Sequence, residues 1–160
     1  MDDLGNRDTV NLRSGSNEDY DIDVLTNRYT AVDANSLSYD SAGNLTKDKD
    51  GYEYQYDYEN RIVKITKDGN DIAKFSYDAL GRRIRKIDSI AGTTRLYYNN
   101  PDWQVLEEYE VDGQQLTFNS LYTYGNYIDE VLYSYDANSS SQYYYVHDHL
   151  YSPVALVDTS

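Results

Sequence analysis

Apolar and polar residues alternate with a period of two along most of the chain. Tyr52, Tyr54, Tyr56 and Tyr58 fall on one side of this alternation, and the polar residues between them fall on the other. Residues two apart in a β-strand lie on the same face, so the pattern predicts half-buried strands. No segment shows the 3.6-residue period of an amphipathic helix. The pattern therefore predicts an all-β protein.

Turn signals divide the predicted strands at regular intervals. A Tyr-Asp pair recurs about every twenty residues, which is within the period range of repeat architectures. The copies begin at Tyr39-Asp40, Tyr56-Asp57 and Tyr77-Asp78, each followed three residues later by Gly43, Asn60 or Gly81, and the last two continue with Arg61 and Arg82. Weaker echoes occur at residues 97–100 and 122–128. Asp side chains start turns, and Gly and Asn accept a left-handed backbone, so each copy predicts a chain reversal.

Asp-Gly pairs lie between the Tyr-Asp copies and predict the intervening reversals. They occur at Asp50-Gly51, Asp68-Gly69 and Asp112-Gly113. Together, the signals predict an antiparallel meander of roughly ten to twelve strands, built from tyrosine-rich β-hairpin repeats that form a curved strip. Residues 1–27 are less regular, and we interpret them as an irregular N-terminal repeat remnant before a repeat strip at 28–160. Because no polar cap is visible at either end, we expect a fragment of a longer array.

Composition narrows the classes of partner. The 160 residues carry a net charge of −14, which argues against a nucleic-acid partner and against anionic membranes. No apolar run is long enough for membrane insertion, and the N-terminus has no targeting signal. The absence of cysteine excludes disulfides and thiolate metal sites. With 20 tyrosines against 2 phenylalanines, we expect a core that contains many hydroxyl hydrogen bonds.

The repeats resemble the YD repeats of the RHS-repeat family, which includes bacterial polymorphic toxins, the shell component of insecticidal toxin complexes, and the teneurins. The resemblance is carried by residues 39–45, 77–82 and 143–158. The last of these looks like the start of the RHS-associated core, which we place at residues 143–160. There Tyr151 stands where the family usually has glycine.

The resemblance implies a long β-strip that coils into a hollow shell. The expected partners are the remainder of the parent repeat polypeptide and its C-terminal effector, which the shell encloses or presents. It also implies a bacterial secreted or cell-surface protein. The self-cleavage site of the family lies further downstream, and no residue of this chain matches it.

His147 and His149 are the strongest candidates for a reactive site. Alternate residues of a strand face the same side, so both imidazoles could reach one metal ion. Two ligands do not complete a tetrahedral site, so we interpret the pair as packing residues and expect no metal and no other cofactor. Asp48-Lys49-Asp50-Gly51 resembles part of a calcium loop, but an Asp-Gly turn explains it without calcium. No nucleophile and base can be placed together, so we expect no enzymatic activity.

The predicted function is therefore that of a structural shell segment. The alternative is a glycan- or cell-surface-binding module, because exposed tyrosine ladders can stack on sugar rings. We favour packing, since Tyr recurs at strand ends within the repeat and not in one patch. Free sheet edges template pairing with another chain, so we expect the isolated fragment to self-associate.

We expect zinc and calcium to change the melting temperature little. A ligand that binds only the native state raises the melting temperature by mass action, so a metal site at His147 and His149 would be visible as a shift. Thermal unfolding with and without micromolar metal measures it, with His147→Ala as the control. A large upward shift in micromolar zinc that disappears in the variant would contradict our interpretation.

Overall fold

The chain is seen here in a computed structural model, which describes residues 6–7, 9–11, 17–127 and 130–158. All the regular elements in the described residues are β-strands, as the alternation predicts. The chain forms two compact units, residues 1–72 and 73–160. The division falls inside strand β9 (Asn70–Tyr77). The described residues include no helix that is long and apolar enough to cross a membrane.

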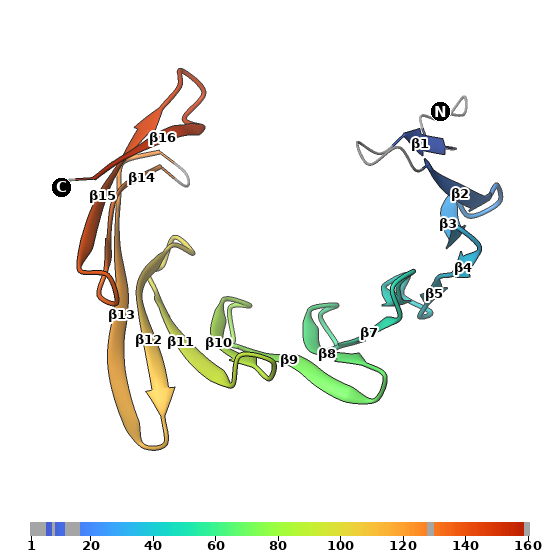
Figure 1. Ribbon diagram of the computed structural model, residues 1–160, viewed down its shortest axis with the longest axis horizontal. Helices are drawn as coiled ribbons and strands as arrows, with labels where there is room; N and C mark the ends of the chain where they lie inside the picture. The colour runs from blue at the N-terminus through green and yellow to red at the C-terminus, as the bar shows by residue number, and fades with distance from the viewer. Residues whose placement is uncertain (1–5, 8, 12–16, 128–129, 159–160) are drawn as a thin grey trace. The chain divides into compact units, whose positions relative to one another are not determined.

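The first unit contains two sets of antiparallel strands that follow chain order (Figure 1). One is a four-stranded sheet, and the other begins with short strands that lengthen along the chain. Their bounds are β1 (Thr9–Asn11), β2 (Asn17–Asp23), β3 (Arg28–Val32) and β4 (Asn35–Ser36), then β5 (Ser38–Tyr39), β6 (Leu45–Lys47), β7 (Tyr52–Tyr56) and β8 (Ile62–Lys67). In β7 the tyrosines are half-buried and alternate with exposed Glu53 and Gln55. Tyr54 lies opposite Ile65 of β8, an aromatic and β-branched pair of the kind that stabilises sheets.

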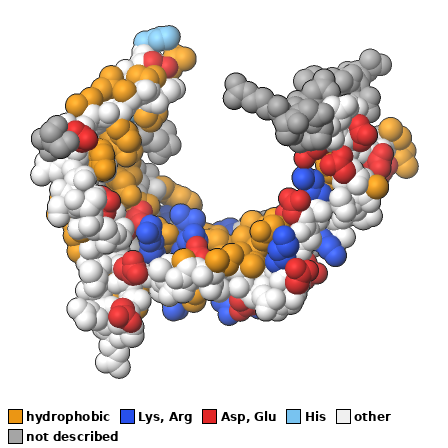
Figure 2. Space-filling model, in the orientation of Figure 1, with side chains coloured by type: hydrophobic (Ala, Val, Ile, Leu, Met, Phe, Trp, Pro, Cys, Tyr) orange, Lys and Arg blue, Asp and Glu red, His pale blue; other side chains and the backbone are white. Residues whose placement is uncertain are grey.

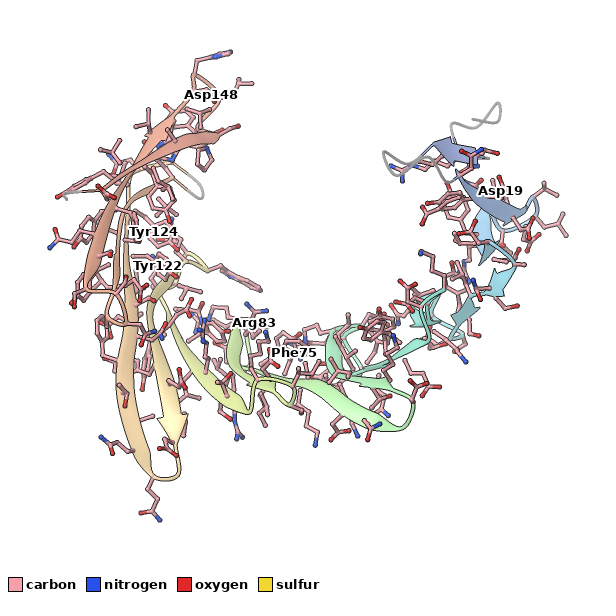
Figure 3. The ribbon with its side chains drawn as sticks, in the orientation of Figure 1. Asp19, Phe75, Arg83, Tyr122, Tyr124 and Asp148 are labelled. Atoms are coloured by element: carbon pink, nitrogen blue, oxygen red, sulfur yellow. The ribbon has the colours of Figure 1, made fainter. Side chains whose placement is uncertain are left out.

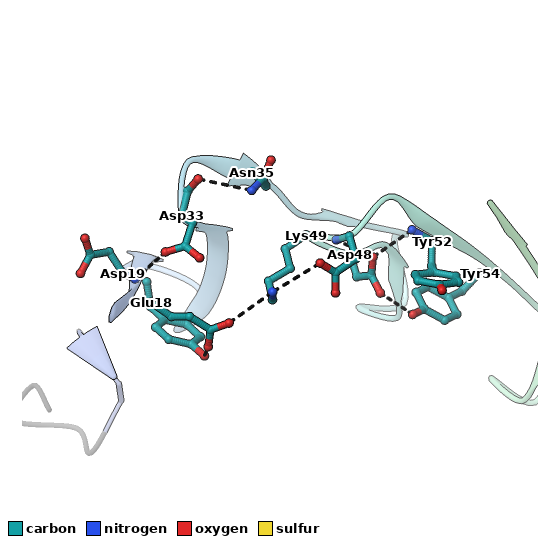
Figure 4. A network of polar contacts seen from close by, with 10 residues as sticks. Glu18, Asp19, Asp33, Asn35, Asp48, Lys49, Tyr52 and Tyr54 are labelled. Carbon is teal, nitrogen blue, oxygen red and sulfur yellow. Dashed lines mark hydrogen bonds and ion pairs between the residues drawn. The ribbon is translucent and has the colours of Figure 1, made fainter. Parts of the chain in front are cut away.

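A polar network connects the four-stranded sheet to the next strands of the first unit (Figure 4). The Lys49 ammonium, in the turn between β6 and β7, lies 3.2 Å from a Glu18 carboxylate oxygen on β2. Tyr20 donates a hydrogen bond to the other Glu18 oxygen, and this contact, followed by that of Lys49, lowers the pKa of Glu18. The ion pair is partly exposed, so it contributes little to the free energy of unfolding, but it fixes a contact between strands far apart in sequence.

The second unit is a meander in which each strand pairs with its neighbours in the sequence (Figure 1). After β9, its strands are β10 (Arg83–Asp88), β11 (Thr93–Asn99), β12 (Val105–Asp112), β13 (Gln115–Tyr124), β14 (Val131–Asp136), β15 (Ser141–His147) and β16 (Pro153–Asp158). All of these pairs are antiparallel. The predicted all-β antiparallel meander is confirmed.

Within each unit the core is a set of contacts along the sheet, and the described residues of that unit form no second layer over it. The buried apolar residues among those described are Ala31, Val32, Ala73 and Tyr97, and no large side chain is fully enclosed. In the second unit, Arg83 lies 4.8 Å from the centre of the Tyr97 ring and 5.9 Å from that of Phe75 (Figure 3). These cation–π contacts cover rings that a single-layer sheet would otherwise leave open to water.

Several details differ from the predictions. Sixteen strands are found in the described residues, more than the ten to twelve expected, because four of them, β1, β4, β5 and β6, have only two or three residues, too few for alternation alone to reveal. Tyr58 is not on the face of its three neighbours; it lies in a turn and is exposed. The tyrosines are mostly half-buried, and Tyr97 alone among those described is buried. The domain boundary proposed at residue 28 stays a prediction and falls at the turn between β2 and β3.

Candidate functional site

The Tyr-Asp motif forms a five-residue turn closed by its own aspartate. At Asp78, the backbone N–H donates to the carbonyl of Arg82 at 3.0 Å, and the Gly81 N–H donates back to the Asp78 carbonyl at 3.0 Å. The Asp78 Oδ1 atom accepts the N–H groups of Leu80 and Arg82, both at 2.9 Å. One carboxylate oxygen thus satisfies two backbone donors that the turn leaves without strand partners. We call this arrangement a capped turn.

Six capped turns occur in the described residues. Five have all four hydrogen bonds and begin at Asp48, Asp57, Asp78, Asn100 and Asp148; the sixth begins at Asp40 and has three of the four. The turns that begin at Asp40, Asp57 and Asp78 contain the predicted motif residues. The turn that begins at Asp48 explains the calcium-like segment, because Asp48 Oδ1 accepts two backbone N–H groups and Oδ2 accepts the Tyr54 hydroxyl at 2.6 Å.

The second oxygen of the capping carboxylate is held by the residue that closes the turn. Arg82 Nε donates to Asp78 Oδ2 at 2.7 Å, and Arg61 Nε donates to Asp57 Oδ2 at 2.8 Å. In the turn that begins at Asp40, Asn44 Nδ2 donates to Asp40 Oδ2 at 2.9 Å. These contacts explain why Arg or Asn directly follows the left-handed residue in the three motif copies. Arg and Asn supply the side-chain donors that a carboxylate prefers.

The hydrogen bonds favour the ionised form of four capping carboxylates, those of Asp40, Asp48, Asp57 and Asp78. Burial raises the pKa of Asp78 and of Asp57, but the side-chain and backbone hydrogen bonds from Arg82 and Arg61 outweigh it, so both pKa values are lowered. The pKa of Asp40 is lowered chiefly by the Asn44 side chain. For Asp48, burial is again outweighed, by the Tyr54 hydroxyl and the backbone donors, and the pKa is lowered.

The fourth residue of every capped turn has a positive φ. The expected left-handed backbone is found at Gly43, Asn60 and Gly81, with φ of 93°, 62° and 84°. The same position is taken by Gly51, and by Trp103 and Tyr151 with φ of 69° and 62°. Bulky side chains rarely adopt this conformation, and the strain amounts to about 1–2 kcal/mol. Tyr151 thus has the left-handed backbone that Gly43, Gly51 and Gly81 have in the other capped turns.

Capped turns gather at one end of the strands in each unit, which we call the rim. Successive strands of a meander reverse direction, so every second connection lies at the same end. The turns at 40–44 and 57–61 share the rim of the first unit, and those at 78–82, 100–104 and 148–152 share the rim of the second. The turn at 48–52 lies at the opposite end in the first unit.

Neighbouring rim turns contact one another. Asn44 Nδ2 donates to Asn60 Oδ1 at 2.8 Å in the first unit, and Arg82 Nη1 donates to the Asn100 carbonyl at 2.8 Å in the second. A pairing shift also lies beside each of these turns, for example between Gln55 and Tyr56 and between Val146 and His147. Such β-bulges bend a strand and increase its twist, so the rim turns are tied to the local curvature of the sheet.

In two motif copies, the tyrosine that precedes the capping aspartate ties one hairpin to the previous one. The Tyr39 hydroxyl donates to the Tyr29 carbonyl and the Tyr56 hydroxyl to the Leu45 carbonyl, both at 2.8 Å. Tyr124 on β13 repeats the contact with the Val105 carbonyl at 3.0 Å (Figure 3). The hydroxyl allows this use of tyrosine, which phenylalanine could not replace.

Tyrosine rings elsewhere on the second unit pack on each other. Tyr98, Tyr109, Phe118 and Tyr135 come from four successive strands, and their ring centres follow one another at 5.3, 5.6 and 6.2 Å. The first two contacts are edge-on and the third is stacked. Such pairs favour the packing interpretation over an open platform for sugars. Glycan binding stays a prediction.

His147 and His149 are not arranged as predicted. His147 is the last residue of β15, whereas His149 lies in the capped turn that begins at Asp148, so strand alternation does not place them on one face. His147 instead stacks on Tyr145, with ring centres 6.4 Å apart. No group of three or more His, Asp or Glu side chains in the described residues is arranged to hold a metal ion.

Sequence reasoning recorded the turn that begins at Asn100 only as a weak echo of the repeat, and it did not assign the turn that begins at Asp148. Their fourth residues are Trp103 and Tyr151, so the Gly or Asn signal is absent. The available signal was an Asp or Asn that directly follows an aromatic-rich strand. The echo at 122–128 forms a different turn, in which the Gly125 N–H donates to the Glu130 carbonyl; residues 128 and 129 lie outside the described part.

Comparison with known proteins identifies this arrangement. The model of the teneurin YD-shell family matches residues 5–160. The tRNA3(Ser)-specific nuclease WapA of Bacillus spizizenii is 33% identical over 163 residues, which cover 99% of this chain and 7% of that protein. The tRNA nuclease WapA of Bacillus subtilis is 35% identical over 130 residues, covering 78% and 5%. The chain thus spans less than a tenth of either relative.

Solved structures show the same fold. The crystal structure of TcdB2-TccC3 covers 91% of this chain with a TM-score of 0.53 at 13% identity, and the match spans 9% of that chain. The crystal structure of TcdB2-TccC3 without its hypervariable C-terminal region also covers 91% of this chain and gives 0.52 at 13% identity. At this identity the likeness concerns the fold alone.

We expect Gly81→Val to lower the free energy of unfolding by about 1–3 kcal/mol, because a β-branched residue is strained at a φ of 84°. Gly81→Asn is the matched control, since Asn60 occupies the same position of another capped turn. Urea unfolding of both variants measures the difference. Equal loss of stability in the two variants would show that volume, and not backbone conformation, governs this position.

We expect acid to destabilise the fold through the capping carboxylates. The pKa values of Asp40, Asp48, Asp57 and Asp78 are lowered in the native state, so the contribution of these groups is complete above the unfolded value of 3.8 and is lost as pH falls through the lower native values. Melting temperatures from pH 7 to pH 2 should therefore fall mainly below about pH 4. Asp78→Asn removes one such group and should flatten the fall; an unchanged slope would contradict this role of Asp78.

Proposed function

Because the chain belongs to the teneurin YD-shell family, we propose that it is a structural wall segment of a larger bacterial toxin-type polypeptide. The observation that carries this proposal is the capped turn, which recurs six times in the described residues with the same backbone contacts. A device that repeats along a chain and joins to its neighbours builds an extended surface, because each unit is stabilised mainly by the next.

The proposed partners are the rest of the parent polypeptide and a C-terminal effector that the wall encloses or presents. The much greater length of the Bacillus relatives supports this, since the chain matches 7% and 5% of them. Their names describe tRNA nucleases, and we place that activity outside the segment that this chain matches. The net charge of −14 supports this assignment, because contact with tRNA phosphates requires clustered basic residues.

We also propose that the parent protein is secreted or displayed on the bacterial cell surface, and that this segment itself is not an enzyme. The arrangement of the candidate residues supports the second point. The Tyr54 hydroxyl bonds to the capping carboxylate of Asp48, and the Tyr39, Tyr56 and Tyr124 hydroxyls bond to backbone carbonyls, so these groups are engaged in holding the fold.

A chimera tests the wall function. This chain replaces the matching stretch of the Bacillus spizizenii WapA, and limited proteolysis and tRNA cleavage are measured on the product. We expect the chimera to retain both the protease resistance of the parent and its nuclease activity. Asp57→Ala with Asp78→Ala in the chimera should increase proteolysis of the segment about tenfold, because cleavage follows the population of locally opened chain.

Asp102→Ala is the matched control, since Asp102 is an exposed aspartate of a capped turn that does not cap it. Proteolysis that is equal in the control and in the double variant would contradict the role of the capped turns. The isolated chain should not cleave tRNA. Cleavage by the purified chain that disappears in His147→Ala would contradict the structural assignment.

A further inference from the structure

A cavity of about 250 Å³ lies on the second unit beside the end of β12. Strands β12 and β13 form most of it, and the turn between β14 and β15 completes it. Strands β11 and β15 continue the sheet on either side of β12, β13 and β14, so the cavity is built within the described sheet. The residues that line it are Glu110, Asp112, Thr117, Phe118, Asn119 and Asn138.

Two carboxylates in this cavity are unpaired. Glu110 and Asp112 make no hydrogen bond or ion pair with the residues that the structure describes. They are two residues apart on β12, so they project from one face about 6–7 Å apart along the strand. Arg95 lies opposite Glu110 in the sheet register, but its guanidinium contacts Glu108 of the same face at 3.4 Å. One cation therefore lies near three carboxylates, and Figure 2 shows Asp and Glu side chains toward the turn between β12 and β13.

A nearly buried amide also lines the cavity. Asn119 is only 4% exposed and is the extra residue of β13 at the point where its pairing with β12 shifts. Its Oδ1 atom accepts the Ser120 hydroxyl at 2.9 Å, and its Nδ2 group has no acceptor among the described residues. Buried polar groups are normally paired, and β-bulges re-aim side chains next to functional sites. A ligand in the cavity can supply the acceptor that the fold does not.

We propose that this cavity binds an amino sugar, a single ring that carries hydroxyl groups and a protonated amine. The ammonium group donates charge-assisted hydrogen bonds to the carboxylates of Glu110 and Asp112. A ring or hydroxyl oxygen accepts the hydrogen bond of Asn119 Nδ2. Thr117 and Asn138 are exposed at the margin of the cavity and can both donate to and accept from the remaining hydroxyls.

Volume and charge select this class of ligand. A cavity of about 250 Å³ is smaller than the roughly 300–1,000 Å³ of pockets that enclose drug-sized ligands, so it suits one sugar ring. The excess of carboxylates disfavours acidic sugars, and N-acetylation removes the positive charge that the carboxylates attract. A plain diamine satisfies the carboxylates but leaves the Asn119 amide without an acceptor. The ligand must therefore combine an ammonium group with oxygen acceptors.

Titration of the isotope-labelled full chain with glucosamine, followed by NMR at slightly acidic pH and physiological ionic strength, tests the proposal. We expect shifts of backbone amides around the cavity and a Kd of about 1 mM, because a ligand of one ring makes few contacts. N-acetylglucosamine and putrescine should each bind about fivefold more weakly or worse, since each lacks one of the two required features. Glucuronate should cause no shifts around the cavity.

Variants assign the binding to the cavity. Asp112→Asn keeps the size of an exposed side chain but removes its charge, so it should weaken glucosamine binding about fivefold or more. Asp102→Asn is the matched control, because Asp102 is an exposed aspartate beyond the opposite end of β12 and the substitution changes the net charge equally. Asn119→Ala should lower the ratio of glucosamine affinity to putrescine affinity, a ratio that a loss of stability alone does not change.

Three outcomes would overturn the proposal. The first is a spectrum in which glucosamine leaves the amides around the cavity unshifted. The second is equal weakening of glucosamine binding by Asp112→Asn and Asp102→Asn. The third is putrescine binding as tight as that of glucosamine, which would show only a general attraction of the acidic chain for cations. None of these outcomes bears on the wall function.

Discussion

A carboxylate oxygen that accepts two backbone N–H groups is the contact on which the rest of this structure depends. A sheet without a second layer cannot rely on an enclosed apolar core to choose its strand pairing. The capped turn makes that choice locally. At Asp78, the carboxylate and the positive φ of Gly81 fix where β9 ends and β10 begins, and the pairing of the hairpin follows.

The capped turns also explain why tyrosine dominates over phenylalanine. A half-buried ring on a single-layer sheet has one edge near water and one near the neighbouring strand. The hydroxyls of Tyr39 and Tyr56 use that position to reach a backbone carbonyl of the preceding hairpin. The ring provides apolar area and the hydroxyl provides a directional contact, so one residue type serves both purposes. Such contacts between successive hairpins are suited to a wall, in which each hairpin must join to the next.

In two capped turns, the fourth residue is a strained aromatic residue in place of Gly or Asn. Trp103 and Tyr151 occupy a position that Gly or Asn fills at lower cost. For Tyr151 the structure shows a compensating contact, because its ring stacks on Tyr127 with centres 4.1 Å apart and so links two adjacent connections of the rim. For Trp103, whose side chain is largely exposed, no compensating ring contact is found in the described residues.

The amino-acid sequence by itself determined the strand alternation, the positions of the turns at Asp40, Asp57 and Asp78, and the left-handed residues Gly43, Asn60 and Gly81. These features depend on contacts within five residues, which a local pattern records. The turns that begin at Asn100 and Asp148 are equally local, but their bulky fourth residues, Trp103 and Tyr151, lack the Gly or Asn signal. Only the tertiary structure decided that Tyr97 is buried and Tyr98 is exposed. It also decided that Glu110, Asp112 and Asn119 line one cavity. Each of these outcomes depends on which strands lie on either side, and cross-strand neighbours come from residues distant in sequence.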